Sequence, residues 1–157
     1  MKLEEGRLIA NEVVELLKPL CEKIEIAGSI RREKPEVKDI DIVLLPKGAE
    51  ANAFRQRLEE AGAKTTLAGE KFLQFLFKGA QVDIYLAKDG NFEILLLIRT
   101  GSAEHNRMLC SKALQKGMKM NFVLGLIDAD RNVVENTEKG ILKKLLGRYV
   151  EPKGRSL

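Results

Sequence analysis

The sequence predicts an α+β fold, in which a mixed sheet with helices on one face is followed by a small α/β C-terminal subdomain. Three observations lead to this prediction. The chain has 157 residues, which is enough for one large core or two small subdomains. Helix-like and strand-like segments mix up to residue 87, in the order helix, two strands, helix, three strands. The turn-forming Asp89-Gly90-Asn91 then separates residues 1–89 from residues 90–157.

The first part of the chain supplies the sheet and its covering helices. Apolar residues at helical spacing predict an amphipathic helix over 3–20. Short β-branched runs predict strands over 24–27 and 40–45. A second helix is expected over 52–61, and glycines divide 64–87 into further strands.

The second part is richer in helical patterns. We expect helices over 92–98 and 103–116. The segments 120–129 and 133–134 resemble a hairpin, and a short helix follows over 138–146. These elements would form the small C-terminal subdomain.

Composition limits the function classes. Lys and Arg outnumber Asp and Glu by 27 to 23, giving a net charge of +4, which favours an anionic partner. Cys21 and Cys110 lack metal-binding spacing, so we expect reduced thiols rather than zinc ligands. The best apolar run, 94–98, is too short to span a bilayer, and we expect a cytoplasmic protein with no membrane association.

Three aspartates form the main candidate site. Asp39 and Asp41 are two apart on a predicted strand, so both point to one face. Asp83 is the lone carboxylate on another apolar strand. If the two strands are neighbours, the carboxylates converge into a hard oxygen site suited to Mg²⁺ or Mn²⁺. Two such ions serve nucleotidyl transfer, whereas the alternative interpretation is that these are solvent-facing strand charges.

A candidate phosphate-binding loop precedes these aspartates. Gly28 and Ser29 follow a strand, where a glycine allows close backbone approach and a hydroxyl can meet phosphate oxygens. Arg32 can add a two-pronged contact. A Gly-Ser pair alone is more often an ordinary turn, and the ordered set with the aspartates is what favours the phosphate-binding interpretation.

Together these motifs resemble the family X DNA polymerases, within the polymerase beta-like nucleotidyltransferase superfamily. Residues 28–32 followed by Asp39 and Asp41 are similar to the family's GSxRR…DxD motif. Residues 100–106 are similar to its TGSxxxN motif, and 117–126 continue the match. The resemblance covers nearly the whole chain. It implies a nucleotidyltransferase palm over 1–89 and a fingers-like subdomain over 90–157, without the family's additional DNA-binding and lyase domains.

The resemblance also implies a role for each matched residue. Asp39, Asp41 and Asp83 would be catalytic and would hold two Mg²⁺ ions, with Mn²⁺ as a substitute. A nucleoside triphosphate would be bound by Gly28, Ser29, Arg32, Lys38, Gly101, Ser102 and Asn106. DNA, as a primer-template or a gapped duplex, would be contacted by His105, Lys143, Lys144 and Arg148. The implied activity is transfer of a nucleotide to a DNA 3′-hydroxyl in gap filling or repair, by a monomer.

Several alternatives stay open at this point. Ile98 and Arg99 replace an aromatic pair that many members carry, and Cys110 replaces a basic residue, so ribose discrimination and templating are not implied. Ser102 could cap the helix that follows it, and His105 could have only a local role there. The rival function is an untemplated terminal transferase or an enzyme that nucleotidylates RNA or protein. A catalytically silent nucleic-acid-binding module is the third.

Overall fold

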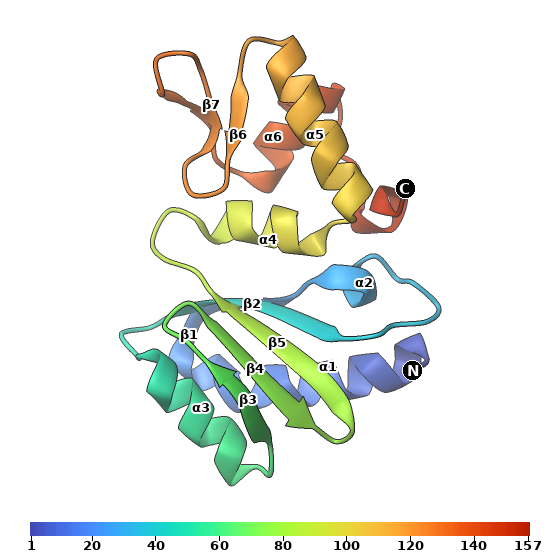
Figure 1. The fold of residues 1–157 in the computed structure, drawn as a ribbon, viewed down its shortest axis with the longest axis vertical. Helices are drawn as coiled ribbons and strands as arrows, with labels where there is room; N and C mark the ends of the chain where they lie inside the picture. The colour runs from blue at the N-terminus through green and yellow to red at the C-terminus, as the bar shows by residue number, and fades with distance from the viewer.

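The first half of the chain builds a five-stranded mixed sheet. The computed structural model describes all of residues 1–157. Its larger sheet has the order β1-β2-β5-β4-β3 (Figure 1). The strands are β1 (Cys21–Ile26), β2 (Ile40–Pro46), β3 (Lys64–Ala68), β4 (Phe72–Phe77) and β5 (Ala80–Leu86). Strands β2 and β5 run parallel, whereas the other neighbours are antiparallel.

Two helices cover one face of this sheet, as predicted. Helices α1 (Leu3–Leu17) and α3 (Ala51–Glu60) present apolar side chains to the sheet and close a core of 19 buried residues. The expected first helix was longer, but its last turn is a 3-10 helix, Lys18–Leu20. Pro19 lies in that turn and cannot donate the backbone hydrogen bond that an α-helix needs.

Strand β2 is buried on both faces, and this explains its continuous apolar sequence. Ile40, Ile42 and Leu44 belong to the core beneath α1 and α3. Val43 and Leu45 belong to a smaller cluster on the opposite face, which contains Phe92 and Leu96 of α4 (Phe92–Thr100). Side chains alternate along a strand, so Asp41 shares the second face with Val43 and Leu45.

The second half of the chain forms a separate layer beyond α4. Figure 1 shows α4 between the large sheet and the remaining C-terminal elements. These are α5 (Ala103–Gln115), β6 (Lys119–Asn121), β7 (Gly125–Ile127), β8 (Val133–Glu135), α6 (Glu138–Leu146) and the 3-10 helix η2 (Pro152–Arg155). They enclose a core of nine buried residues that includes Ile94 and Leu97 of α4, so α4 packs on both halves.

Two segments differ from the sequence predictions. Residues 28–31 form a one-turn helix, α2 (Gly28–Arg31), where a loop was expected. Residues 120–129 do not form one hairpin strand, because a turn separates β6 from β7. The Asn121 side chain causes this turn, since its amide oxygen accepts hydrogen bonds from the backbone N–H groups of Val123 and Leu124, each 2.9 Å long.

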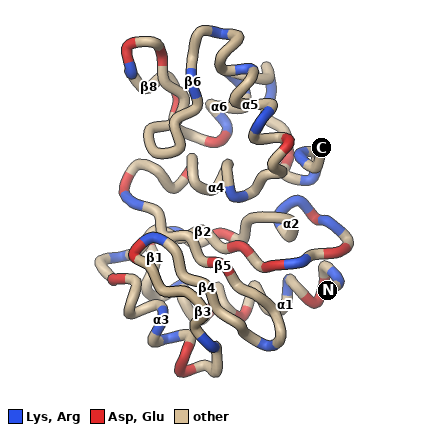
Figure 2. The backbone as a smooth tube through the Cα atoms, in the orientation of Figure 1, with Lys and Arg blue, Asp and Glu red and all other residues tan.

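Charged residues are interspersed over both halves (Figure 2). None of the helices is both long and apolar enough to cross a membrane.

Candidate active site

The parallel pairing of β2 with β5 sets Asp41 directly beside Asp83. Their Cα atoms are partners in the strand register, and both side chains lie on the face that looks toward α4. Asp39 comes two residues before Asp41, just ahead of the first residue of β2. The neighbouring-strand arrangement on which the three-carboxylate prediction depended is therefore present.

The surroundings of Asp41 disfavour its negative charge. Burial, followed by the nearby Asp83 and Asp39 carboxylates, raises the pKa of Asp41 to about 6, although Arg99 and Arg32 act in the opposite direction. Burial and the Asp41 charge likewise raise the pKa of Tyr85 to about 12. A cation near Asp41 would offset both costs.

Asp83 is held by two glutamine side chains. Its Oδ1 accepts a hydrogen bond from Gln74 Nε2 at 3.0 Å and another from Gln81 Nε2 at 3.2 Å. Gln74 is the cross-strand partner of Asp83 on β4. Neither glutamine was predicted as a site residue, although Gln81 is two residues before Asp83 and the strand period places it on the same face.

The Gly28-Ser29 segment approaches Asp41 very closely. The backbone of Gly28 has a φ of +61°, and a Cβ atom built there would lie 2.1 Å from Asp41 Oδ2. The Ala27 N–H also donates to the Asp41 backbone carbonyl over 2.8 Å. Only glycine allows both this φ and this contact, so the motif fixes the loop against the carboxylate.

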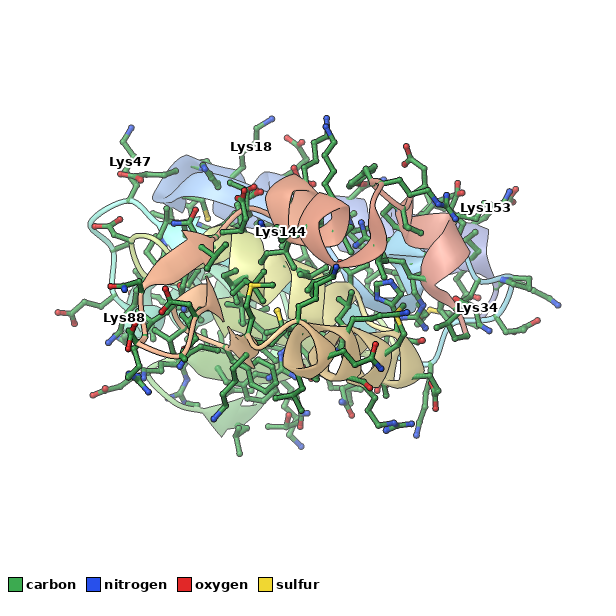
Figure 3. The ribbon with its side chains drawn as sticks, turned by 90° about the horizontal axis from the view of Figure 1, so that it is seen from above. Lys18, Lys34, Lys47, Lys88, Lys144 and Lys153 are labelled. Atoms are coloured by element: carbon green, nitrogen blue, oxygen red, sulfur yellow. The ribbon has the colours of Figure 1, made fainter.

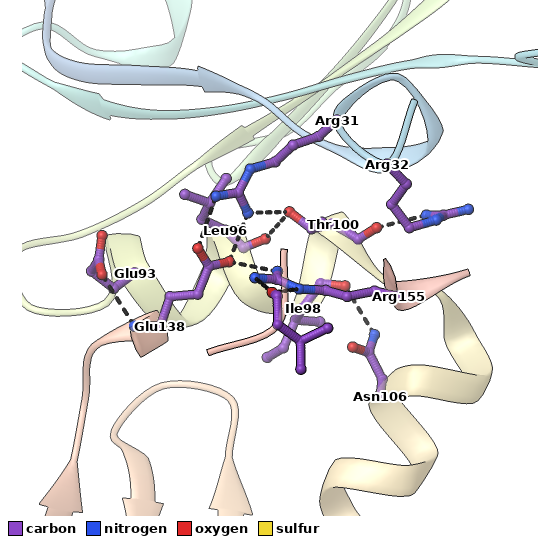
Figure 4. A network of polar contacts seen from close by, with 10 residues as sticks. Arg31, Arg32, Glu93, Leu96, Ile98, Thr100, Asn106, Glu138 and Arg155 are labelled. Carbon is purple, nitrogen blue, oxygen red and sulfur yellow. Dashed lines mark hydrogen bonds and ion pairs between the residues drawn. The ribbon is translucent and has the colours of Figure 1, made fainter. Parts of the chain in front are cut away.

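The two arginines of the motif point to different partners (Figure 4). Arg32 donates from Nη1 to the Thr100 carbonyl at 2.6 Å and from Nε to Ser156 Oγ at 2.9 Å. Burial lowers the pKa of Arg32, whereas Asp41 raises it. Arg32 is thus beside the aspartate face, but two of its donor groups are already used by the C-terminal half.

Arg31 instead joins a buried ion-pair network. It donates to both carboxylate oxygens of Glu138, at 2.6 and 2.8 Å, and to Thr100 Oγ1 at 2.8 Å. Arg155, whose side chain is fully buried, donates to the same carboxylate at 2.8 Å. Burial raises the pKa of Glu138, but the two arginines outweigh it and leave that pKa below its usual value. No feature of the sequence indicated this network.

The 100–106 motif forms the end of α4 and the start of α5. Ser102 caps α5 by accepting from the His105 N–H at 3.2 Å, and its hydroxyl donates to the Arg155 carbonyl at 2.8 Å. Asn106 donates from Nδ2 to the Ile98 carbonyl at 2.9 Å, while its Oδ1 has no partner. Gly101 has a φ of +67° and faces Arg32.

One cavity of about 360 Å³ collects these elements. It is lined by every residue predicted to bind the nucleotide, together with Asp39 and Asp41, namely Gly28, Ser29, Arg32, Lys38, Gly101, Ser102 and Asn106. Tyr85, Ile98, Arg99 and Ala103 also line it. The Arg99 guanidinium stacks on the Tyr85 ring, with 4.3 Å between Cζ and the ring centroid. A larger groove, about 820 Å³, lies between β1 and α6. Arg31 and Glu138 line it, and it shares no residue with the cavity.

The oxygen-only ligand set of the cavity fits a divalent hard cation. In this structure, however, no three His, Cys, Asp or Glu side chains are gathered into a metal-binding arrangement. Asp83 does not line the cavity, and its carboxylate is bound to the two glutamine amides. Neighbouring carboxylates repel one another, and a shared cation would offset this repulsion.

The residues predicted to contact DNA lie outside this cavity. His105 is only 1% exposed, and neither of its ring nitrogens has a hydrogen-bond partner. Its burial, with Arg155 and Arg32 nearby, lowers the pKa of His105 to about 4. Contact between His105 and DNA would require the covering segment to move. Lys143, Lys144 and Arg148 are exposed at the end of α6, and Figure 3 shows Lys144 over that helix.

Comparisons with known proteins agree with this arrangement. Residues 95–156 match the family described as DNA polymerase beta thumb. The whole chain superposes on Leishmania infantum polymerase beta in a ternary P/T complex with a TM-score of 0.84 and 21% identity, covering 100% of this chain and 77% of that one. The ternary gap complex of the same polymerase superposes with a TM-score of 0.84 and 20% identity. That match covers 100% of this chain and 71% of the polymerase chain. No curated protein matches the chain.

The structure and these matches identify the fold of this chain. The chain has the polymerase beta fold throughout, and its residues 95–156 carry the polymerase beta thumb sequence. The resemblance to family X DNA polymerases is thus confirmed. The region that the family description calls the thumb, residues 95–156, lies within the subdomain over 90–157 that we expected to be fingers-like.

Proposed function

We propose that this protein is a metal-dependent nucleotidyltransferase that adds a nucleotide to a DNA 3′-hydroxyl, as a family X polymerase. The observation that carries the proposal is the single cavity in which Asp41, the Gly28-Ser29 loop and Arg32 meet. Such a cavity combines carboxylates for a cation with backbone and guanidinium donors for phosphate oxygens. The polymerase beta fold supports the same assignment.

Each part of the cavity has a proposed task. Asp39, Asp41 and Asp83 would hold two Mg²⁺ ions, which lower the pKa of an attacking hydroxyl and steady a leaving pyrophosphate when they are bound. Ser29, Arg32 and Lys38 would bind the triphosphate, and Gly101, Ser102 and Asn106 would line the sugar and base. The Oδ1 of Asn106 is buried and has no hydrogen-bond partner, so a ligand donor that reached it would satisfy it.

Primer extension tests the proposal. The substrates are single-stranded, recessed and one-nucleotide-gapped DNA, each offered with deoxy- and ribonucleotides in Mg²⁺ and then in a chelator. We expect templated, metal-dependent addition with the gapped or recessed substrate. Additions that ignore the template would instead indicate a terminal transferase, and failure to extend any of them would contradict the proposal.

A further inference from the structure

Helix α5 connects the candidate active site to a second, apolar groove. Ala103 and Asn106, in its first turn, line the active-site cavity. Farther along α5, Cys110 and Leu114 line a groove of about 400 Å³. Strand β6 and its turn supply the other wall, with Lys119, Met120, Asn121 and Phe122. Helix α5 and strand β6 lie side by side (Figure 1). We call this the hairpin groove.

The hairpin groove is bordered by unusually exposed apolar side chains. Leu114 is 67% exposed, Phe122 58% and Val123 63%. These residues are not in a loose loop, because the Asn121 side chain bonds to the backbone of the turn. A fixed apolar patch with an outward aromatic ring is the kind of surface that marks a binding site.

The chain segment that forms the groove is basic, although Arg107 at its start is paired with Glu104. No Asp or Glu occurs between Glu104 and Asp128. Over the same stretch Arg107, Lys112, Lys116 and Lys119 are all exposed, and Figure 2 shows basic segments on α5 and at its connection to β6. Charge complementarity therefore favours a polyanion with apolar parts, and nucleic acid is such a ligand.

An aromatic ring in a basic groove can bind bases only where they are unpaired. In a duplex the base faces are stacked inside, whereas single strands offer each base to an aromatic side chain while their phosphates contact Lys and Arg. At a primer-template the unpaired nucleotides nearest the reacting end belong to the template's 5′ extension.

We propose that the hairpin groove binds an unpaired base of this template extension, with Phe122 as the stacking ring and Lys119 beside the phosphates. The identity of the strand rests on the proposed function, whereas the groove's affinity for unpaired bases does not. Asn106 and Leu114 are eight residues apart on α5, or about 12 Å at the rise of an α-helix. A stacked strand covers about 3.4 Å per nucleotide, so the bound base is about four nucleotides from the active site.

Binding to primer-templates whose 5′ extensions have one, two, four, six or eight nucleotides tests the proposal without catalysis. We expect the affinity to rise about tenfold between two and six nucleotides, in line with the stacking of one base. This rise in affinity should disappear in Phe122→Ala and persist in Phe122→Trp. With the wild-type protein it should also disappear when the fourth nucleotide of the extension is abasic. Leu67→Ala is the matched control, because Leu67 is 51% exposed on the distant strand β3.

The outcomes separate the two proposals. A wild-type affinity that does not depend on extension length, or a rise unaffected by Phe122→Ala, overturns the hairpin groove as a base-binding site. A change in oligomeric state in Phe122→Ala, with DNA binding unaltered, would assign the patch to a protein contact and also overturn it. Phe122-dependent binding of a single-stranded octanucleotide by a protein that extends no primer would retain the groove and reject the proposed function.

Discussion

Asp41 occupies a position where burial and two neighbouring carboxylates make a negative charge costly. Its carboxylate is beside Asp83 in the strand register, and its Oδ2 faces the backbone of Gly28. The Asp-x-Asp spacing and the strand period were enough to predict this face from the sequence. The glutamines that hold Asp83, and the Tyr85–Arg99 stack, could not be predicted because they depend on which strands and helices are neighbours.

Asp83→Asn should abolish nucleotide transfer while leaving the fold intact. The amide keeps an oxygen that can accept from Gln74 and Gln81, but it removes the charge that would hold a cation. Loss of a metal-ion contribution of several kcal/mol corresponds to a rate decrease on the order of a thousandfold. Transfer would be measured by primer extension in Mg²⁺, with Asp89→Asn, on an exposed turn, as the control. Unchanged transfer would refute the three-carboxylate site.

Gly28→Ala should destabilise the protein and inactivate it. The left-handed backbone costs a non-glycine residue about 1–2 kcal/mol, and the new Cβ would collide with Asp41 Oδ2. Gly48→Ala is a matched control, because Gly48 has a φ of +67° but nothing within 4 Å of its Cβ position. Thermal unfolding should show a loss in both variants, and only Gly28→Ala should lose activity. Equal activity in the two would mean that the contact with Asp41 is unimportant.

His105 should make the stability of the protein depend on pH. Its folded pKa of about 4 lies below the value of about 6.5 expected in the unfolded chain. The unfolded state therefore binds the proton more readily, and stability present above pH 6.5 is lost as the pH falls toward 4. The loss is up to about 3 kcal/mol.

Denaturant unfolding between pH 7 and pH 4 measures this dependence. His105→Phe should reduce it, because an apolar ring cannot take up the proton. Glu138, near His105, also has a lowered pKa, so part of the decline below pH 4.5 will persist in that variant. Asp41, whose pKa is raised to about 6, adds stability as the pH falls over the same range, so the comparison between the two proteins isolates His105. An identical pH dependence in the wild type and in His105→Phe would contradict the assignment.

At the scale of elements, α2 joins the two halves of the chain. This single turn supplies Arg31 to Glu138 at the start of α6, and Arg32 follows it to reach the end of α4. The sequence predicted a phosphate-binding loop here and not the helix Gly28–Arg31, because four residues are too few to show a period. Local patterns also gave no sign that Glu138 and Arg155 would be buried together.

Glu138→Ala should destabilise the protein strongly. Removing one partner of a buried ion pair leaves uncompensated charge, which costs about 3–5 kcal/mol. Here Arg155 is fully buried and Arg31 mostly so. Chemical denaturation measures the loss, and Glu151→Ala, at an exposed position in the same half, should change stability little. A Glu138→Ala protein as stable as the wild type would show that the arginines find other partners.

At the scale of the whole molecule, the order of elements and the α+β class were predictable, since hydrophobic periodicity determines them. The docking of the two halves was not, because it depends on side chains that are far apart in sequence. The basic surface is similarly dispersed (Figure 2), and a DNA-binding face cannot be assigned from charge alone.

DNA binding should be weak and depend steeply on salt. Each phosphate contact contributes a log–log slope of about −0.9 on duplex DNA. Charge reversal at Lys143, Lys144 and Arg148 should flatten this slope if α6 contacts the DNA backbone. Reversal at Lys47 and Lys88, which are exposed at the left edge of Figure 3 and away from Lys144, serves as the control. DNA-binding titrations followed by fluorescence anisotropy between about 50 and 200 mM salt measure the slope for each variant. Affinity independent of salt would exclude backbone contacts and favour an acceptor other than DNA.

The single parallel pair in the large sheet also has a consequence for the order of folding. The antiparallel pair β4–β5 joins residues close in sequence, whereas β2 pairs with residues 42 positions later, as Asp41 does with Asp83. Closing so long a loop costs entropy before its contacts form, so such pairing tends to be slow. The two aspartates would therefore come together late, and a folding intermediate with a formed β3–β4–β5 meander would still lack the paired aspartate face.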